Sequence, residues 1–145
     1  MVLQITPIKN GSVIDHINSE KTLKIMEMLE LGKAEEKVTV AFNLESRALG
    51  KKGIIKVEGR EITKDEMERI ALLAPEATIN YIEDCKVVKK QKVEAPDVVV
   101  GIIKCNNPKC ITNFERTPTK FFKEEDKYRC NHCERTTHKN LLNLG

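Results

Sequence analysis

Four of the five cysteines in this chain lie close together near its C-terminal end, as two pairs. Cys105 and Cys110 are separated by four residues, and Cys130 and Cys133 by two. Each pair fits a tight turn, and two such turns can bring four thiolates to the corners of a tetrahedron, the geometry that zinc prefers. The spacing therefore predicts one structural zinc ion per chain. Four protein ligands leave no position open for water, so this zinc is expected to stabilise a fold and not to catalyse a reaction.

The remaining cysteine and two of the histidines are expected to stay outside this site. The alternative for the four thiols is a pair of disulfide bonds, which a reducing compartment disfavours. His132 and His138 are alternative zinc ligands, but four cysteines complete the site, so both are expected at the surface. Cys85 stands alone and is interpreted as a small apolar residue, with a reactive thiol as the alternative.

A second group of residues suits a ligand that carries phosphates, although both common phosphate-binding motifs, GxGxxG and GxxxxGK[ST], are absent. Lysines on neighbouring strands can act as point charges on a polyphosphate, and a carboxylate can accept hydrogen bonds from an amine or a ribose hydroxyl. Surface lysines are usually only solvated, so composition alone leaves this role open. The residues concerned are Asp15, His16, Lys52, Lys56 and Lys90.

Two helices are expected among the elements that position these side chains. Asn18 or Ser19 can cap a helix over residues 20–31, and Gly32 can end it. Thr63 begins a capping box for a second helix, which must end near Pro75. The apolar side of the first helix comprises Leu23, Ile25, Met26, Met28 and Leu29; that of the second comprises Met67, Ile70, Ala71 and Ala74.

Alternating apolar residues predict the strands, and the GKKG segment at residues 50–53 is expected to form a polar loop. The order is β-α-β-β-α-β with one additional strand, which is the ferredoxin-like plan of an α+β domain with two helices on one face of a sheet. The predicted strands cover residues 3–8, 13–17, 38–44, 54–57, 77–82 and 86–93.

A linker is expected at residues 94–97, where Pro96 interrupts strand pairing. It divides the chain into an N-terminal domain, residues 1–96, and a small all-β zinc domain, residues 97–145. The second domain is too short to bury much core. Structural zinc contributes on the order of 10–16 kcal/mol of folding free energy in small peptides, which would dominate its stability.

The charge balance and the hydropathy pattern indicate an ordinary soluble protein. Residues 1–96 carry 16 basic and 16 acidic side chains, and residues 97–145 carry 9 and 6, which accounts for the net charge of +3. No apolar run approaches the ~20 residues that cross a bilayer, and the N-terminus does not resemble a secretory signal. We therefore expect a cytoplasmic protein that has no membrane partner.

The residues alone leave two rival functions open. A zinc ribbon that binds nucleic acid could stack bases on its aromatic rings. Aromatic residues in so small a domain more often form its core, and acidic residues 124–126 lie among them, so no nucleic-acid partner is expected. An enzyme would need a nucleophile and a base; Asp15 and His16 point apart if their strand is regular. The aromatic residues are Phe114, Phe121, Phe122 and Tyr128.

Four further segments are informative as a set: IKNGSVIDHI at residues 8–17, FNL at 42–44, GKKGIIKVE at 50–58 and APEATIN at 74–80. Together with CNNPKC at 105–110, they resemble the regulatory chains of aspartate carbamoyltransferase. The similar segments spread over essentially the whole chain. The resemblance implies a non-catalytic subunit of that enzyme, which acts in pyrimidine biosynthesis and carries a site for the effectors ATP, CTP and UTP.

The resemblance also implies the residues of the effector site. Lys90 and His16 would face the phosphates, Lys52 would be a further phosphate contact, and Asp15 and Lys56 would serve the ribose and the base. Cys85 stands where some members have tyrosine. The implied pocket comprises Pro7, Ile8, Val13, Asp15, His16, Lys52, Lys56, Asn80, Ile82, Val87 and Lys90.

The assembly that the resemblance implies contains two catalytic trimers bridged by three regulatory dimers. The N-terminal domains would pair with each other, and the zinc domain would contact the catalytic chain. Residues beside the zinc ligands are the expected contacts with that chain, namely Asn107, Asn113 and Glu134.

Overall fold

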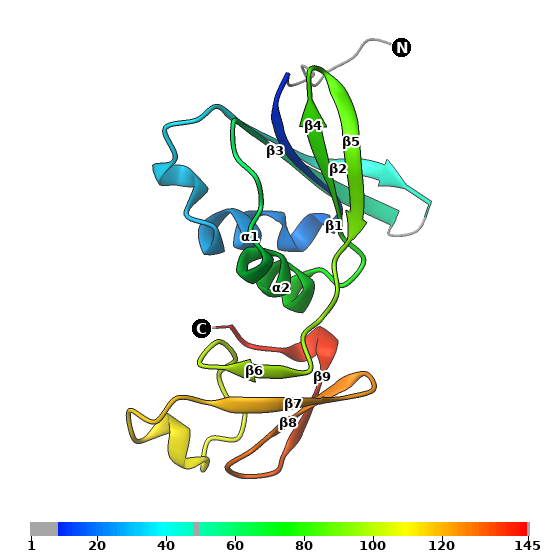
Figure 1. Cartoon of the computed structure of the whole chain (residues 1–145). Helices are drawn as coiled ribbons and strands as arrows, with labels where there is room; N and C mark the ends of the chain where they lie inside the picture. Colours follow the sequence, from blue (N-terminus) through cyan, green and yellow to red (C-terminus); the bar gives the residue numbers. More distant parts are fainter. Residues whose placement is uncertain (1–8, 48–49, 145) are drawn as a thin grey trace. The chain divides into compact units, whose positions relative to one another are not determined.

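Alternating residues of the N-terminal part form a five-stranded sheet in this computed structural model, which describes residues 9–47 and 50–144 (Figure 1). Its strand order is β2-β3-β1-β4-β5, and every neighbouring pair is antiparallel. The strand predicted over residues 3–8 lies outside the described residues. The strands are β1 (Gly11–Asn18), β2 (Val38–Ser46), β3 (Gly50–Glu58), β4 (Thr78–Glu83) and β5 (Lys86–Lys92).

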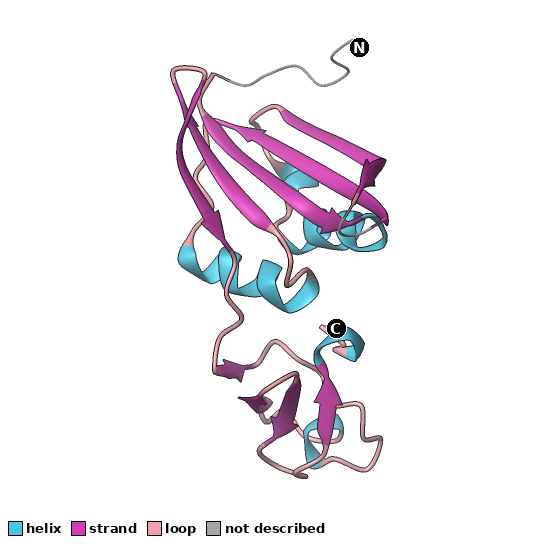
Figure 2. Ribbon diagram, turned by 90° about the vertical axis from the view of Figure 1, so that its right-hand side faces the viewer, coloured by secondary structure: helices cyan, strands magenta, loops and turns pink. Residues whose placement is uncertain are grey.

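Two helices cover one face of this sheet, α1 (Thr22–Met28) and α2 (Lys64–Leu73) (Figure 2). The capping box predicted for the second helix is confirmed, because the Thr63 hydroxyl accepts from the Glu66 N–H and the Glu66 carboxylate accepts from the Thr63 N–H. The order β1-α1-β2-β3-α2-β4, with β5 added at the edge beside β4, confirms the ferredoxin-like α+β prediction.

The first helix is shorter than predicted. Instead of residues 20–31, α1 covers only seven residues and is flanked by 3-10 turns at Ser19–Lys21 and Leu31–Lys33. Gly32 does not end it; Glu30 turns the chain with a φ of 54°. Leu23, predicted on the apolar side, is 57% exposed. A helix of two turns can bury only a narrow stripe, and that stripe is formed here by Thr22, Ile25 and Leu29.

The core of the first unit lies between the helices and the sheet. Ile14 and Ile17 of β1 lie beside Ile55 and Val57 of β3 and Ile79 of β4, and all five are fully buried. From α2, the predicted inner residues Ile70, Ala71 and Ala74 are buried, whereas Met67 is only half-buried. Leu72 and Leu73 of the same helix are buried as well, which the predicted stripe missed.

Residues 50–53 extend β3 instead of forming the predicted polar loop. The reason is close packing at Gly53, which pairs with Ile17 of β1. A Cβ atom at this glycine would lie 2.0 Å from the hydroxyl of Thr22, the first residue of α1. Thr22 is fully buried. Only a glycine lets α1 approach the sheet this closely. Glycine in the sequence indicated a loop at this position, but in the structure its missing side chain makes room for Thr22.

The C-terminal part forms a four-stranded antiparallel sheet in the order β6-β7-β8-β9. The chain divides by its internal contacts into Met1–Glu94 and Ala95–Gly145, and we call the second the metal unit. Its core comprises Val99, Ile103, Phe121, Tyr128 and Leu142 together with three cysteines. The strands are β6 (Val98–Val100), β7 (Lys120–Glu124), β8 (Lys127–Cys130) and β9 (Thr136–His138).

Among the described residues, no helix has the length and the apolar character needed to cross a membrane.

The packing at Gly53 generates a prediction about stability. Gly53→Ala should lower the free energy of unfolding by about 1–3 kcal/mol, because the new methyl group must displace the buried Thr22. Urea unfolding followed by circular dichroism measures this. Gly32→Ala is the matched control, since a Cβ atom there meets no atom within 4 Å. Equal stability of the two variants would contradict the packing argument.

Candidate metal centre and effector site

The four paired cysteines converge on one point of the metal unit. Their sulfurs all lie within 4.8 Å of one another, and among the described residues this is the group of cysteine, histidine and acidic side chains that suits a metal ion. Cys105 and Cys133 Sγ are 3.6 Å apart, and Cys110 and Cys130 Sγ are 3.8 Å apart. A tetrahedral site with metal–sulfur bonds of about 2.3 Å places its sulfurs about 3.8 Å apart. The donor set therefore fits one structural metal ion.

Two short turns position these sulfurs. In the first, the Cys110 N–H donates to the Asn107 carbonyl at 3.0 Å, so the chain folds back and brings Cys110 beside Cys105. In the second, the Glu134 N–H donates to the Cys130 carbonyl at 2.8 Å. Backbone N–H groups also point at the sulfurs: that of Asn107 at Cys105, and those of His132 and Cys133 at Cys130. Such donors stabilise thiolates, which are the form that binds a metal.

Burial works against ionisation of the thiols when no metal is bound. It raises the pKa of Cys105 to about 12, although the Asn107 N–H opposes the rise, and it raises the pKa of Cys130 as well. Burial also acts to raise the pKa of the Cys133 thiol, but hydrogen bonds outweigh it and lower this pKa to about 7. These bonds come from the Arg135 backbone, the Asn107 side chain and the neighbouring thiols. A bound cation would have to displace protons from this cluster.

The other thiol and imidazole groups take no part in the cluster. All five cysteines are free, and no disulfide joins the pairs. His132 is exposed and His138 half-buried on β9, and neither belongs to the group of four. The interpretation of Cys85 as an apolar residue is wrong, because its side chain is exposed. It forms a tight two-residue turn with Asp84 between β4 and β5, and both have positive φ.

The helix-free face of the first sheet carries the predicted effector residues. Val13 of β1 pairs with Lys56 of β3 on one side and with Asn80 of β4 on the other, and Asn80 pairs with Lys90 of β5. Directly paired residues of neighbouring strands point to the same face. We call the row Lys56–Val13–Asn80–Lys90 the open-face row. Adjacent residues in a strand point to opposite faces of the sheet. The sequence neighbours of Val13 and Lys56 are all buried, so the open-face row points away from the buried face; these neighbours are Ser12, Ile14, Ile55 and Val57.

Other predicted residues lie beside this row. Ile82 pairs with Val87 between β4 and β5, and Asp15 pairs with Thr78 between β1 and β4. The sheet thus brings together nine of the eleven predicted side chains from four strands. Pro7 and Ile8 lie outside the described residues. A hollow of about 250 Å³, lined by residues 10–11, 59–61, 81–83 and 88, includes only Ile82 of the predicted set.

Asp15 and His16 do not point apart, because β1 is irregular there. Its pairing with β3 shifts register between Ile14 and Ile17, and His16 has a φ of 57°. The Asp15 carboxylate accepts from the His16 N–H at 2.6 Å and lies 2.9 Å from Lys52 Nζ. His16 Nδ1 lies 3.0 Å from the Thr78 hydroxyl. The sequence analysis did not predict Thr78 as a residue of this site. It lies two positions before the predicted residue Asn80, and residues two positions apart in a strand share a face.

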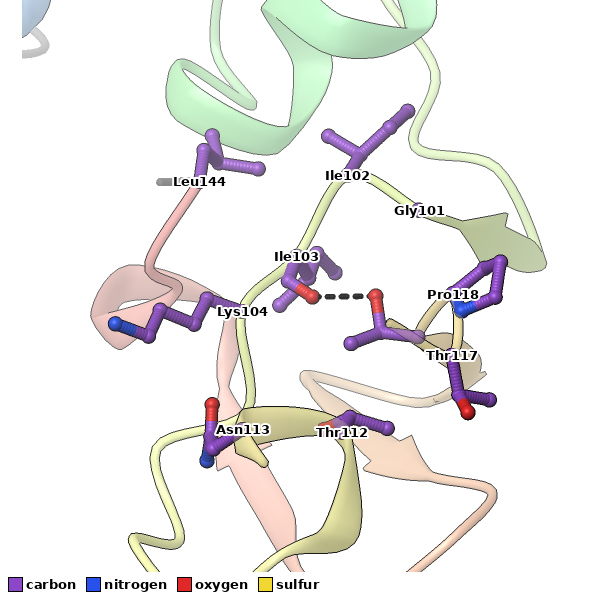
Figure 3. Close-up of a pocket in the computed structure, with 10 residues that line it drawn as sticks. Gly101, Ile102, Ile103, Lys104, Thr112, Asn113, Thr117, Pro118 and Leu144 are labelled. Atoms are coloured by element: carbon purple, nitrogen blue, oxygen red, sulfur yellow. Dashed lines mark hydrogen bonds between the residues drawn. The ribbon is translucent and has the colours of Figure 1, made fainter. Parts of the chain in front are cut away.

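The predicted interface residues surround the metal cluster. Asn107 and Asn113 are half-buried, and Glu134 is exposed with a φ of 64°. Asn113 ends the 3-10 turn Ile111–Asn113 and lines a hollow of about 440 Å³ in the metal unit (Figure 3). Two of the residues that line this hollow are joined by a hydrogen bond, which the Thr119 hydroxyl donates to the Ile103 carbonyl at 2.6 Å. Thr112, whose hydroxyl lies 3.2 Å from Cys110 Sγ, is a neighbour of the metal site that sequence reasoning missed.

The aromatic residues of the metal unit do not form a platform for stacked bases. Phe121 and Tyr128 are buried in its core, with 1% and 2% exposure. Phe122 lies against two cations, Lys120 Nζ at 5.3 Å and the Arg129 guanidinium at 5.9 Å from the ring centre. Phe114 is 74% exposed, and Phe122 is half-buried. This arrangement disfavours the nucleic-acid alternative, because base binding needs several accessible rings.

Comparison with known proteins gives the same family for both units. Residues 3–94 match the family described as "Aspartate carbamoyltransferase regulatory chain, allosteric domain", and residues 97–142 match its "metal binding domain". The regulatory chain from Pyrococcus abyssi is 52% identical over 139 residues, covering 92% of this chain and 91% of that protein. Those from Thermococcus sibiricus and Methanococcus maripaludis strain C5 are each 48% identical, over 97% and 93% of this chain and 95% and 93% of their own lengths.

The raised thiol pKa values predict that metal affinity depends steeply on pH. Below pH 8, Cys105 and Cys130 hold protons in the metal-free unit and release them on binding. Each released proton contributes a factor of ten per pH unit, so affinity should rise at least about 100-fold per unit between pH 6 and 8, and more steeply below pH 7, where Cys133 is protonated as well. Competition with a chelator, corrected for the chelator's own protonation, measures this. Cys85→Ser is the control and should behave as the unmodified chain does; an affinity independent of pH would refute the prediction.

Proposed function

This chain belongs to the family of aspartate carbamoyltransferase regulatory chains, and we propose that it binds the nucleotides ATP, CTP and UTP and thereby controls the catalytic chain. The family is named as regulatory and not catalytic, and its catalytic chain is the partner that membership implies. The observation that carries the proposal is the open-face row. It presents two lysines, an amide and an apolar side chain from four adjacent strands on the face that no helix covers.

The chemistry of this face suits a nucleoside triphosphate. Lys90 and His16 would face the phosphates, while Asp15, Lys56 and Asn80 offer hydrogen-bonding groups to the ribose and the base. Val13, Ile82 and Val87 supply apolar surface against a purine or pyrimidine ring. Lys52 is paired with Asp15 at 2.9 Å, so a contact between Lys52 and a phosphate would require this ion pair to rearrange. Pro7 and Ile8 complete the proposed site.

Pairing of two regulatory chains is supported by the two edges of the first sheet. The β5 edge carries four lysines in seven residues, which opposes pairing with another strand. Strand β2, at the other edge, has only one charged residue among its nine, Glu45, and its Phe42 is 39% exposed, so this edge is better suited to pairing. We propose that the regulatory dimer forms through the first unit. Three such dimers and two catalytic trimers would make the complete assembly.

The metal unit is proposed to dock on the catalytic chain through the loops around the sulfurs. Asn107, Asn113 and Glu134 are the proposed polar contacts. Ile111 and Phe114 lie on the same loop with 49% and 74% of their surface exposed, which supports an apolar contact there. Tyrosine, phenylalanine and other large apolar side chains are typical of the central part of protein interfaces.

Zinc is the proposed metal, because a closed set of four thiolates with tetrahedral spacing suits this ion and leaves no position for a substrate. Its role would be to fold the unit that docks. The cytoplasm is the proposed compartment, since four free thiols persist in a reducing environment.

Regulation would follow from linkage. A nucleotide that binds more tightly to the regulatory chains in one state of the assembly shifts the population toward that state. Couplings of about 1–3 kcal/mol are typical, which changes an apparent substrate affinity by about 5- to 150-fold. No chemistry is required of this chain, only different contacts with the effector in the two states.

The experiment that tests the function is reconstitution with catalytic trimers from the same organism. The metal-loaded chain should form a larger assembly, seen by its mass in solution, and CTP and ATP should shift the aspartate saturation curve. Lys90→Ala should weaken nucleotide binding about 10- to 100-fold, because a charge-assisted contact is lost.

Lys89→Ala is the matched control for that variant. Lys89 pairs with Tyr81 and lies 5.7 Å from its ring, outside the open-face row, so its loss should leave nucleotide affinity unchanged. An assembly whose curves ignore nucleotides would reduce the chain to a scaffold. Failure of the metal-loaded chain to assemble at all would overturn the proposed function.

Docking through the metal unit generates a separate prediction. Phe114→Ser should weaken binding to catalytic trimers about tenfold or more, because an exposed aromatic anchor is removed, and it should leave metal content unchanged. Leu141→Ser, which changes an apolar side chain of the same unit with 69% exposure, is the control. Binding measured by titration would argue against this docking surface if the two variants behaved alike.

A further inference from the structure

Asn107 links the two cysteine pairs independently of any metal. Its backbone N–H donates to the Cys105 sulfur, and its side chain hydrogen-bonds to the Cys133 sulfur, which belongs to the other pair. Its carbonyl accepts the N–H of Cys110, and its side-chain oxygen accepts the N–H of Lys109. One residue therefore contacts three of the four cysteines.

Asn113 in turn holds Asn107 in place. Its side-chain Nδ2 donates to the Asn107 carbonyl at 2.7 Å and to the Cys105 carbonyl at 3.2 Å. An amide nitrogen carries two hydrogens, so both donors of this side chain are used inside the metal unit. The backbone N–H of Asn113 also donates to the Cys110 carbonyl at 3.0 Å. The two asparagines thus form a continuous chain of hydrogen bonds around the first turn.

We infer that Asn107 and Asn113 are positioning residues of the metal centre: together they hold Cys105 and Cys133 at the spacing that a tetrahedral ion requires. Cys133 is the ligand that most needs this support. It is the least buried of the four, and its Sγ lies 3.6 Å from Cys105 Sγ, the side of the cluster on which Asn107 lies. Groups that orient metal ligands typically contribute 10- to 100-fold to metal affinity.

The inference goes beyond the proposed contacts with the catalytic chain and does not depend on them. It also limits those contacts. Because both hydrogens of Asn113 Nδ2 are engaged within the unit, a partner could meet this side chain only through its carbonyl oxygen. A docking defect in an Asn113 variant would then arise mainly from loss of metal, and excess zinc should correct it.

The test is the rate at which zinc passes from the full-length chain to a chromophoric chelator. Asn107→Ala, which removes the side chain bonded to the Cys133 sulfur, and Asn113→Ala, which removes the donors that hold the Asn107 turn, should each release zinc about 10- to 100-fold faster than the unmodified chain. Asn106→Ala is the matched control. Asn106 belongs to the same turn, and its Nδ2 also donates to a backbone carbonyl at 3.2 Å, but that carbonyl belongs to Leu141 and not to a residue of either cysteine pair.

Cobalt substitution distinguishes altered positioning from a failure to fold. With cobalt in excess, the Asn113→Ala and Asn107→Ala chains should still show the intense bands of a tetrahedral thiolate site, with a weaker or shifted charge-transfer band. Release from both variants at the rate of Asn106→Ala would overturn the inference. So would a docking defect of Asn113→Ala that persists when zinc is saturating and the cobalt spectrum is unchanged, because Asn113 would then act through the partner. Wild-type chain that holds zinc but does not assemble would overturn only the proposed function.

Discussion

The metal unit depends on one interaction, the coordination of a cation by four thiolates. Its strands contain three to five residues each, and its core has only a few large side chains. Three of the four cysteines lie in that core, and burial raises the pKa of two of them, Cys105 and Cys130, in the absence of a metal. A metal replaces this unfavourable burial with four strong bonds, so the same residues that would weaken the unit become its main source of stability. The loops that the bonds hold are the loops that present the proposed docking residues.

In the first unit, the main constraint is that both helices pack on the same face of the sheet. Short connections on either side of α1 and α2 place them against Ile14, Ile55 and Ile79, and the backbone of Gly53 allows α1 to come close. Within the described part of the chain, no helix covers the opposite face. Side chains on that face need not be apolar, and a row of lysines and an amide can therefore occupy the middle of the sheet without a cost in core packing. The proposed effector site is a consequence of this one-sided packing.

The two proposed roles separate along the chain. Effector binding requires a face that is open and polar, while docking requires loops that are held rigidly, and the two units supply these in different ways. Linkage needs only that the nucleotide binds differently in two states of the whole assembly. No residue of this chain then has to take part in the carbamoyl transfer itself, in agreement with a family that is named for regulation.

The sequence alone was enough to predict the four metal-binding cysteines, the order of the described helices and strands of the first unit, and the family. Cysteine spacing, strand alternation and the Thr63 capping box are patterns within short segments, and such patterns can be recognised without knowledge of the tertiary structure. Tertiary structure decided what depends on contacts between distant segments. Gly53 reads as a loop residue until Thr22 is seen to pack on it, and Asp15 and His16 seem to point apart until the bulge in β1 turns them together. Likewise, the bonds from Asn113 to residues six and eight positions away are visible only once the turn has closed around the cysteines, because hydrogen bonds between such groups follow from backbone geometry that spacing alone does not specify.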